Sequence, residues 1–193
     1  MTTAPKDCSE DRALLLALLR RRSVRYGEFT LASGAKTNVY VDCRLTTLAA
    51  EAIGPLGRVF LDKIAARGWR PDTVGGLTLG ADPIVSAVAR ESVDRGRPID
   101  GFLVRKEPKG HGRQQYVEGV AEAAGRSAVI VEDVCTSGGS ALLAAERARD
   151  FGFEVIGVVC LVDRESGGAA AIEAAGLAFE RVYTMDEVTA EPA

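Results

Sequence analysis

A short apolar stretch that runs directly into two carboxylates, a glycine-rich turn and a helix constrains this chain most. Residues 129–140 read Val-Ile-Val-Glu-Asp-Val-Cys-Thr-Ser-Gly-Gly-Ser. The β-branched residues predict a buried strand over 128–131, and the Ala- and Leu-rich segment over about 140–150 predicts a helix. A strand followed at once by a helix is the unit from which parallel sheets are built. The sequence therefore predicts an open α/β sheet.

The residues between that strand and that helix have the chemistry of a phosphate site. Gly138 and Gly139 let the main chain approach a ligand closely, so the N–H groups of residues 136–140 can surround a phosphate. The positive end of the helix dipole adds to this attraction. Glu132 and Asp133 are expected where the strand leaves the sheet, the edge at which open α/β folds bind ligands. This arrangement suits a ribose 5-phosphate, although the residues alone also allow an ordinary strand–turn–helix with acidic caps.

The rest of the chain extends the α/β pattern. The further strands expected from residue 73 onward cover 73–77, 101–104, 155–161 and 177–183, and the further helices cover 81–94 and 169–175. This alternation predicts a mainly parallel sheet with helices on both faces. The earlier segments break the alternation: a helix over 10–22, two short strands over 26–31 and 38–42, and a long helix over 47–67 that is expected to be interrupted or restarted near Gly54-Pro55. We expect the first part of the chain to form a small cap near the ligand edge.

Composition limits the partners of this chain. Its 193 residues fit one domain, and its net charge of -3 argues against general binding to nucleic acid or to a membrane surface. It has no apolar run of about 18 residues, so no transmembrane helix is expected. The four cysteines are widely spaced and lack a C-x-x-C pair. They are expected to be reduced thiols in a cytoplasmic protein.

A second motif concentrates positive charge in this acidic chain. Its basic residues are Arg105, Lys106, Lys109, His111 and Arg113. Pro108, Gly110 and Gly112 oppose a helix there, so the segment is predicted to be a loop. A basic loop can close over a polyanion and exclude water, whereas a solvated basic turn is the alternative.

Together, the basic loop and the acidic motif resemble those of the orotate phosphoribosyltransferases, which are type I phosphoribosyltransferases. The resemblance covers most of the chain, and its motifs are Glu132–Ser140, Arg105–His111 with 117–119, the stretch 74–83, Phe29–Gly34 with Tyr40–Arg44, and Asp163-Arg164. It implies a single α/β domain over 1–193 with a mainly parallel central sheet flanked by helices. Residues 1–45 and the C-terminal end would form a small cap, or hood. Residues 70–165 would form the core that binds 5-phosphoribosyl 1-diphosphate (PRPP).

The resemblance also implies an activity and a role for each motif. The activity is transfer of the 5-phosphoribosyl group from PRPP to orotate, giving orotidine 5′-monophosphate and pyrophosphate in UMP biosynthesis. The residues expected to bind PRPP are Arg105, Lys106, Lys109, His111, Glu132, Asp133, Val134, Cys135, Thr136, Ser137, Gly138, Gly139 and Ser140. The residues expected to take part in catalysis are Lys109, Asp133, Arg105 and His111. The residues expected to contact orotate are Thr136, Arg164 and Tyr40.

A metal and an assembly follow from the same resemblance. Mg²⁺ is expected mainly on PRPP oxygens and water, with no protein ligands. The chain is expected to form a cytoplasmic homodimer whose active sites are shared across the interface, and to bind neither nucleic acid nor membrane. Ala32 and Leu79 depart from the family pattern, because many members have lysines at these two places.

Two other functions remain open at this stage. A phosphoribosyltransferase for adenine or xanthine would share the acidic pair and the phosphate turn, but it is not expected to share the basic loop. A regulator that senses PRPP would need an element that binds nucleic acid, and the sequence has no evident helix-turn-helix.

Overall fold

The computed structural model describes residues 8–30, 36–108 and 115–190. Its helices are α1 (Cys8–Arg22), α2 (Arg44–Thr47), α3 (Ala50–Ala66), α4 (Asp82–Asp94), α5 (Gly139–Phe151), α6 (Gly168–Ala174) and α7 (Met185–Thr189). Its strands are β1 (Val24–Thr30), β2 (Lys36–Val41), β3 (Thr73–Leu77), β4 (Asp100–Val104), β5 (Val117–Glu118), β6 (Ser127–Cys135), β7 (Glu154–Asp163) and β8 (Ala178–Thr184). The alternation predicted from residue 73 onward is present.

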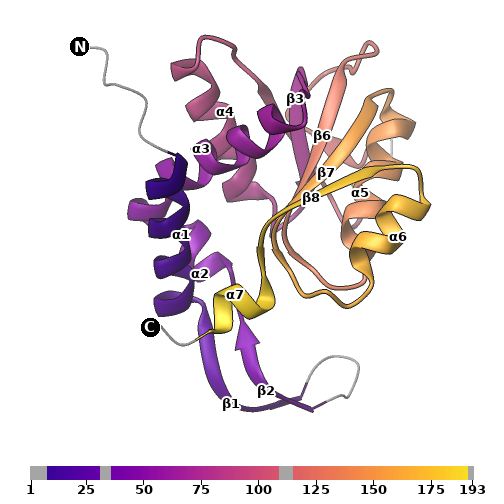
Figure 1. Ribbon diagram of the computed structural model, residues 1–193. Coiled ribbons are helices and arrows are strands. Elements are labelled where there is room, and N and C mark those ends of the chain that lie inside the picture. The colour runs from indigo at the N-terminus through magenta and orange to yellow at the C-terminus, as the bar shows by residue number, and fades with distance from the viewer. Residues whose placement is uncertain (1–7, 31–35, 109–114, 191–193) are drawn as a thin grey trace.

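The main sheet has the strand order β5-β4-β3-β6-β7-β8 among the described residues, and Figure 1 shows helices on both of its faces. Neighbouring strands from β4 to β8 run parallel, and only the short β5 is antiparallel to its neighbour. The predicted mainly parallel α/β sheet is therefore confirmed. The sequence did not predict β5, because two residues are too few to show a period.

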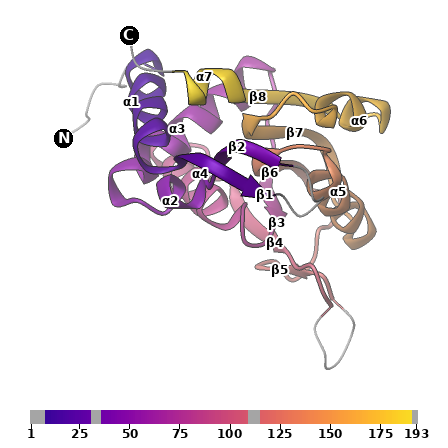
Figure 2. The same ribbon diagram turned by 90° about the horizontal axis from the view of Figure 1, so that it is seen from below.

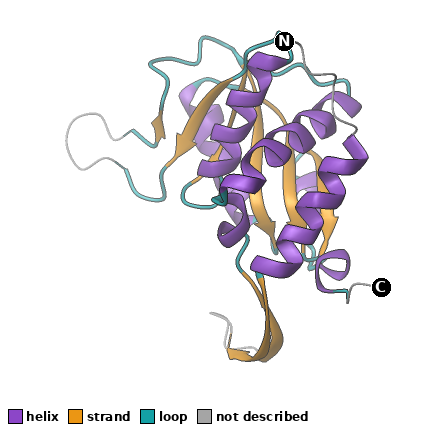
Figure 3. Cartoon of the chain, turned by 90° about the vertical axis from the view of Figure 1, so that its left-hand side faces the viewer, coloured by secondary structure: helices purple, strands orange, loops and turns teal. Residues whose placement is uncertain are grey.

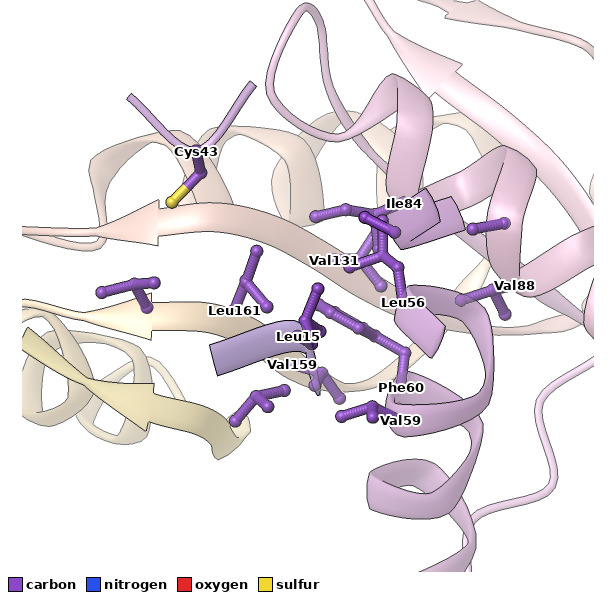
Figure 4. Packing of buried hydrophobic residues seen from close by; sticks show 14 of the residues in the cluster. Leu15, Cys43, Leu56, Val59, Phe60, Ile84, Val88, Val131, Val159 and Leu161 are labelled. Carbon is purple, nitrogen blue, oxygen red and sulfur yellow. The ribbon is translucent and has the colours of Figure 1, made fainter. Parts of the chain in front are cut away.

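Alternation along β6 explains why helices cover both faces of the sheet. Val129 and Val131 pack with residues of α1, α3 and α4, in the cluster that Figure 4 shows from close by. Ala128 and Ile130 point the other way and pack with α5 and α6. All four side chains are fully buried, and burial of each valine or isoleucine stabilises the fold by about 1.5–3 kcal/mol. A strand that is buried on both faces requires the continuous apolar run seen in the sequence.

The acidic pair lies inside β6, which corrects the prediction that it follows the strand. The strand was expected to end at residue 131, but it continues to Cys135 because β7 keeps pairing with it, Glu132 opposite Cys160 and Cys135 opposite Asp163. Consecutive strand residues point to opposite faces. Glu132 and Asp133 therefore face different surroundings, which a loop conformation would not have imposed.

The N-terminal strands form a separate hairpin. β1 and β2 pair antiparallel with each other and not with the main sheet, and the hairpin projects from the body of the molecule in Figures 1 and 3. α7, which was not predicted, lies beside it, and the Tyr26 hydroxyl donates a hydrogen bond of 2.8 Å to the Thr189 carbonyl. The C-terminal part of the described chain thus returns to the N-terminal hairpin.

The long helix expected over 47–67 begins at Ala50, after the short α2 and an extended Ala49. The interruption expected near Gly54-Pro55 was wrong, because α3 continues through Pro55, whose ring lies in the second turn of the helix. No helix in residues 8–30, 36–108 and 115–190 is long and apolar enough to span a bilayer.

An ion-pair network joins three of the helices on one face of the sheet. Arg58 of α3 donates hydrogen bonds to both carboxylate oxygens of Asp11 in α1, at 2.6 and 2.9 Å, and one to Glu91 in α4 at 3.1 Å. The Asp11 side chain is only 3% exposed. Because the pair is withdrawn from water and forms two hydrogen bonds, loss of one partner would leave a buried charge unpaired.

Candidate active site

The turn after β6 forms an open pocket. The pocket is lined by Glu132, Val134, Cys135, Thr136, Ser137, Gly138, Gly139 and Ser140. Gly138 precedes α5 and has a left-handed φ of 78°, which a residue with a side chain rarely adopts. A β-carbon there would also lie 2.9 Å from the Gly168 carbonyl oxygen. The turn thus leads directly into the first N–H groups of α5, a backbone arrangement that commonly binds anions.

Glu132 and Asp133 are carboxylic acids with perturbed pKa values. Burial, together with the nearby Asp133 and Cys135, raises the pKa of Glu132 to about 8, and the Lys106 charge opposes this shift. Burial also raises the pKa of Asp133, against the hydrogen bond of 2.9 Å that its carboxylate accepts from the Val134 N–H. Glu132 lines the open pocket, whereas Asp133 is its neighbour on β6 and does not line it. Two adjacent carboxyl groups of this kind are well suited to a ligand that donates hydrogen bonds or develops positive charge.

Two further segments meet at Asp133. A β-carbon on Gly80, in the loop after β3, would lie 2.4 Å from Asp133 Oδ1. Arg44 and Asp42, which follow the hairpin, are close enough to shift the pKa of Asp133 in opposite directions. Arg44 donates hydrogen bonds to both oxygens of Asp42, at 2.9 and 3.0 Å, and this pairing lowers the pKa of Asp42. The segment after the hairpin therefore borders the acidic pair.

The described stem of the basic loop lies near the same pocket. Arg105 and Lys106 follow β4, and the charge of Lys106 reaches Glu132. The Arg105 N–H donates a hydrogen bond of 2.8 Å to the Tyr116 carbonyl, and its guanidinium lies 3.5 Å from Glu118. Lys109, His111 and Arg113 lie outside the described residues.

Arg164 borders the phosphate turn from the end of β7. Its N–H donates a hydrogen bond of 2.9 Å to the Cys135 carbonyl, and its half-buried side chain has no hydrogen bond or ion pair within residues 8–30, 36–108 and 115–190. The adjacent Asp163 and Glu165 pair instead with Arg181, at 3.0 and 3.5 Å. The guanidinium of Arg164 is consequently available to a ligand.

The remaining expected contacts are more scattered. Thr136 is exposed and lines the pocket, whereas Tyr40 lies on β2 with its ring 5.5 Å from that of Phe29 and does not line it. Leu79 is 67% exposed in the loop after β3. Ala32 lies outside the described residues.

The sequence analysis included Asp42, Arg44 and Gly80 in family motifs but gave none of them a role of its own. Their roles depend on their proximity to Asp133, which is distant from all three in the sequence. Arg181 left no signal, because its importance depends on its contact with the distant Asp163.

A parallel sheet with an acidic pair at the end of a central strand, followed by a phosphate turn at a helix N-terminus, defines a phosphoribosyltransferase. The comparisons with known proteins agree. The family model described as "Phosphoribosyl transferase domain" matches residues 49–186. The chain is 44% identical over 188 residues to the orotate phosphoribosyltransferase of Rhodopirellula baltica, covering 95% of this chain and 97% of that protein.

Solved structures give the same assignment. Orotate phosphoribosyltransferase of Mycobacterium tuberculosis H37Rv in complex with Fe(III) dicitrate matches with a TM-score of 0.83 and 44% identity, over 93% of this chain and 99% of that one. Its complex with PRPP matches with a TM-score of 0.78 and 41% identity, with the same coverage. The chain belongs to the orotate phosphoribosyltransferase family.

Proposed function

We propose that this chain transfers the 5-phosphoribosyl group from PRPP to orotate, reversibly, giving orotidine 5′-monophosphate and pyrophosphate for UMP synthesis. The observation that supports this most directly is the pocket of residues 132 and 134–140. It joins the turn over residues 136–140 to the partly buried Glu132, with the charge of Lys106 close to Glu132. The choice of orotate as the acceptor base is supported by the relatives, which are orotate phosphoribosyltransferases.

The pocket suits the ribose 5-phosphate half of PRPP. The N–H groups of residues 136–140 and the start of α5 would bind the 5-phosphate, with Val134 and Cys135 completing the wall. The ribose hydroxyls would donate hydrogen bonds to Glu132 and Asp133, which favours the charged form of both acids. In the reaction the bond from C1 to the pyrophosphate oxygen breaks and a bond from C1 to an orotate ring nitrogen forms, and that nitrogen loses its proton to solvent. The two carboxylates, Asp133 above all, would stabilise the positive charge that the ribose ring gains meanwhile.

The basic loop suits the diphosphate half. Arg105, Lys106, Lys109 and His111 would bind its oxygens and stabilise the negative charge that develops on the departing pyrophosphate. Lys109 is proposed to make the largest contribution, so Lys109→Ala is expected to lower kcat. An unchanged kcat in that variant would remove the leaving-group role of Lys109.

We propose Mg²⁺ as the cofactor, bound together with PRPP. No group of three or more His, Cys, Asp or Glu side chains is arranged to hold a metal ion in the described part of the chain. We propose that the ligands of this ion are mainly PRPP oxygens and water, since Mg²⁺ usually keeps several waters and binds substrate phosphates. When bound, the ion neutralises charge on the diphosphate.

Orotate would lie between the phosphate turn and the hairpin. Arg164 would pair with the orotate carboxylate. This proposal is supported by its guanidinium, which has no partner among the described residues while its neighbours pair with Arg181. Thr136 would contact the base from the turn, and Tyr40 would form part of a wall.

The proposal extends to the organisation of the protein. Residues 1–45 with the C-terminal end would act as a cap on a PRPP-binding core over 70–165, in one domain. We propose a homodimer in which the basic loop of one subunit serves the active site of the other. We also propose a cytoplasmic location, a reducing compartment that suits the buried free thiols Cys43, Cys135 and Cys160. Mixing Lys109→Ala with Gly138→Val subunits tests the sharing, because mixed dimers would regain one intact site. Absence of recovered activity in them would contradict it.

The decisive experiment follows orotate absorbance with purified protein, PRPP and Mg²⁺, beside reactions with adenine, xanthine and uracil. Consumption of orotate alone is expected. Turnover of another base would support the assignment of the PRPP site but overturn the proposed role of Arg164. PRPP binding without turnover of any base would favour a PRPP-sensing protein.

A further inference from the structure

We propose that Arg147 of α5 is a positioning residue that holds Arg105 and Lys106 in place for the diphosphate of PRPP. Arg147 lies outside the pocket and was not singled out by any sequence motif. The inference rests on the proposed function, because it assumes that Arg105 and Lys106 bind the diphosphate. It adds a connection between the helix that holds the 5-phosphate and the loop that holds the other end of the same substrate.

The contacts of Arg147 converge on the stem of the basic loop. Its Nη1 donates hydrogen bonds to the carbonyl oxygens of Arg105 and Lys106, the latter at 3.0 Å. Its guanidinium carbon lies 3.9 Å from the centre of the Tyr116 ring. Tyr116 is on the opposite stem of the loop, and its carbonyl accepts the hydrogen bond from the Arg105 N–H. One side chain thus touches both stems.

These contacts determine how Arg105 and Lys106 leave β4. Two consecutive carbonyls directed at Arg147 fix the orientation of the backbone at both residues, so their side chains leave in defined directions. Figure 2 shows β4 and β5 on the same side of the molecule as α5, and both strands contact that helix. Because the α5 N-terminus forms the phosphate turn, Arg147 lies about 12 Å along the same rigid element. The helix therefore fixes the spacing between the two phosphate-binding parts.

The contact set requires an arginine. A guanidinium can stack one flat face on an aromatic ring while its N–H groups donate in the plane, and a lysine ammonium cannot do both. Arg149, two residues further along α5, is exposed and its side chain has no hydrogen bond or ion pair within residues 8–30, 36–108 and 115–190. It provides a matched control on the same helix.

The test measures which part of PRPP loses affinity. Calorimetry with Mg²⁺ compares PRPP, pyrophosphate and ribose 5-phosphate on the wild type and on Arg147→Met, Arg147→Lys and Arg149→Met. Loss of Arg147 is expected to weaken PRPP and pyrophosphate binding about tenfold, with ribose 5-phosphate binding unchanged. Arg147→Lys is expected to lose the same affinity for PRPP and pyrophosphate as Arg147→Met, and Arg149→Met is expected to bind all three ligands like the wild type. An equal loss for ribose 5-phosphate, or no loss for PRPP, would overturn the proposal.

A second measurement separates this inference from the proposed function. Trypsin cleavage after Arg105 and Lys106, followed by mass spectrometry without substrate, is expected to accelerate in Arg147→Met and Tyr116→Leu but not in Tyr116→Phe. Unchanged cleavage in the first two variants would show that Arg147 does not hold the stem. If the wild type neither binds PRPP nor consumes orotate, the proposed function fails, while the cleavage result still decides whether Arg147 holds the stem.

Discussion

Gly80 and Asp133 are in such close contact that a β-carbon on Gly80 would lie 2.4 Å from Asp133 Oδ1. The two residues come from different strand ends, Gly80 from the loop after β3 and Asp133 from β6. Gly80 has an ordinary φ, so it is required for space alone. The absence of a side chain at one position is thus what lets a proposed catalytic carboxylate occupy its place.

Replacement of Gly80 by alanine is therefore expected to move the Asp133 carboxylate. The contact involves a partly buried carboxylate, so Gly80→Ala should lower kcat/KM by about 10- to 100-fold, since small displacements of a positioned group are costly to catalysis. Steady-state kinetics with orotate and PRPP measure the effect. Gly96→Ala is the control: that site has open space but a left-handed φ of 73°. It should lose about 1 kcal/mol of stability and retain full activity. Full activity in Gly80→Ala would remove the steric argument.

The pKa of Glu132 predicts how stability depends on pH. Burial raises this pKa from 4.5 to about 8, so between these values the folded protein retains a proton that the unfolded chain has released. The free energy of unfolding should therefore fall as pH rises through this interval. In urea denaturation at several pH values, the free energy of unfolding of Glu132→Gln should decline less with pH than that of the wild type, because the glutamine cannot ionise. Glu173→Gln, at an exposed position of α6, should decline like the wild type. Identical slopes for Glu132→Gln and the wild type would contradict the assignment.

Arg164 is expected to determine affinity for the base. Arg164→Ala should raise the KM for orotate by about 10- to 100-fold, the range for a lost charge-assisted pair, with the KM for PRPP nearly unchanged. Arg164→Lys keeps the charge without the bidentate geometry, so its KM for orotate should lie between those of the wild type and Arg164→Ala. Because the side chain has no partner in the described part of the chain, the melting temperature should not change. An unchanged orotate KM in Arg164→Ala would rule out the carboxylate role.

The network of Asp11, Arg58 and Glu91 is expected to stabilise the fold without affecting catalysis. Asp11→Asn leaves Arg58 with a neutral partner in a mostly buried place, and should cost about 2 kcal/mol in chemical denaturation. Asp94→Asn is a suitable comparison, because the Asp94–Arg90 pair is exposed on the surface of α4. It should cost less than about 0.5 kcal/mol. Equal effects in the two variants would mean that burial adds nothing to the Asp11–Arg58 pair.

The sequence by itself determined the fold class and the composition of the phosphate turn. Both are local properties: the apolar run over 128–131 fits a strand buried on two faces, and Gly138 with Gly139 permits the turn before α5 whatever surrounds it. It also predicted a loop for the basic residues of 105–113, because Pro108 and the nearby glycines oppose a helix.

Only the tertiary structure decided how these parts meet. β6 extends to Cys135 because β7 pairs with it, and that pairing turns Glu132 and Asp133 toward different neighbours. Gly80 makes room for Asp133, Arg181 engages the neighbours of Arg164, and Arg147 reaches the stem of the basic loop from another element. Each of these contacts joins residues that are far apart in the chain. Contacts of that kind have no period or spacing in the sequence, since the packing of strands and helices alone brings the residues together.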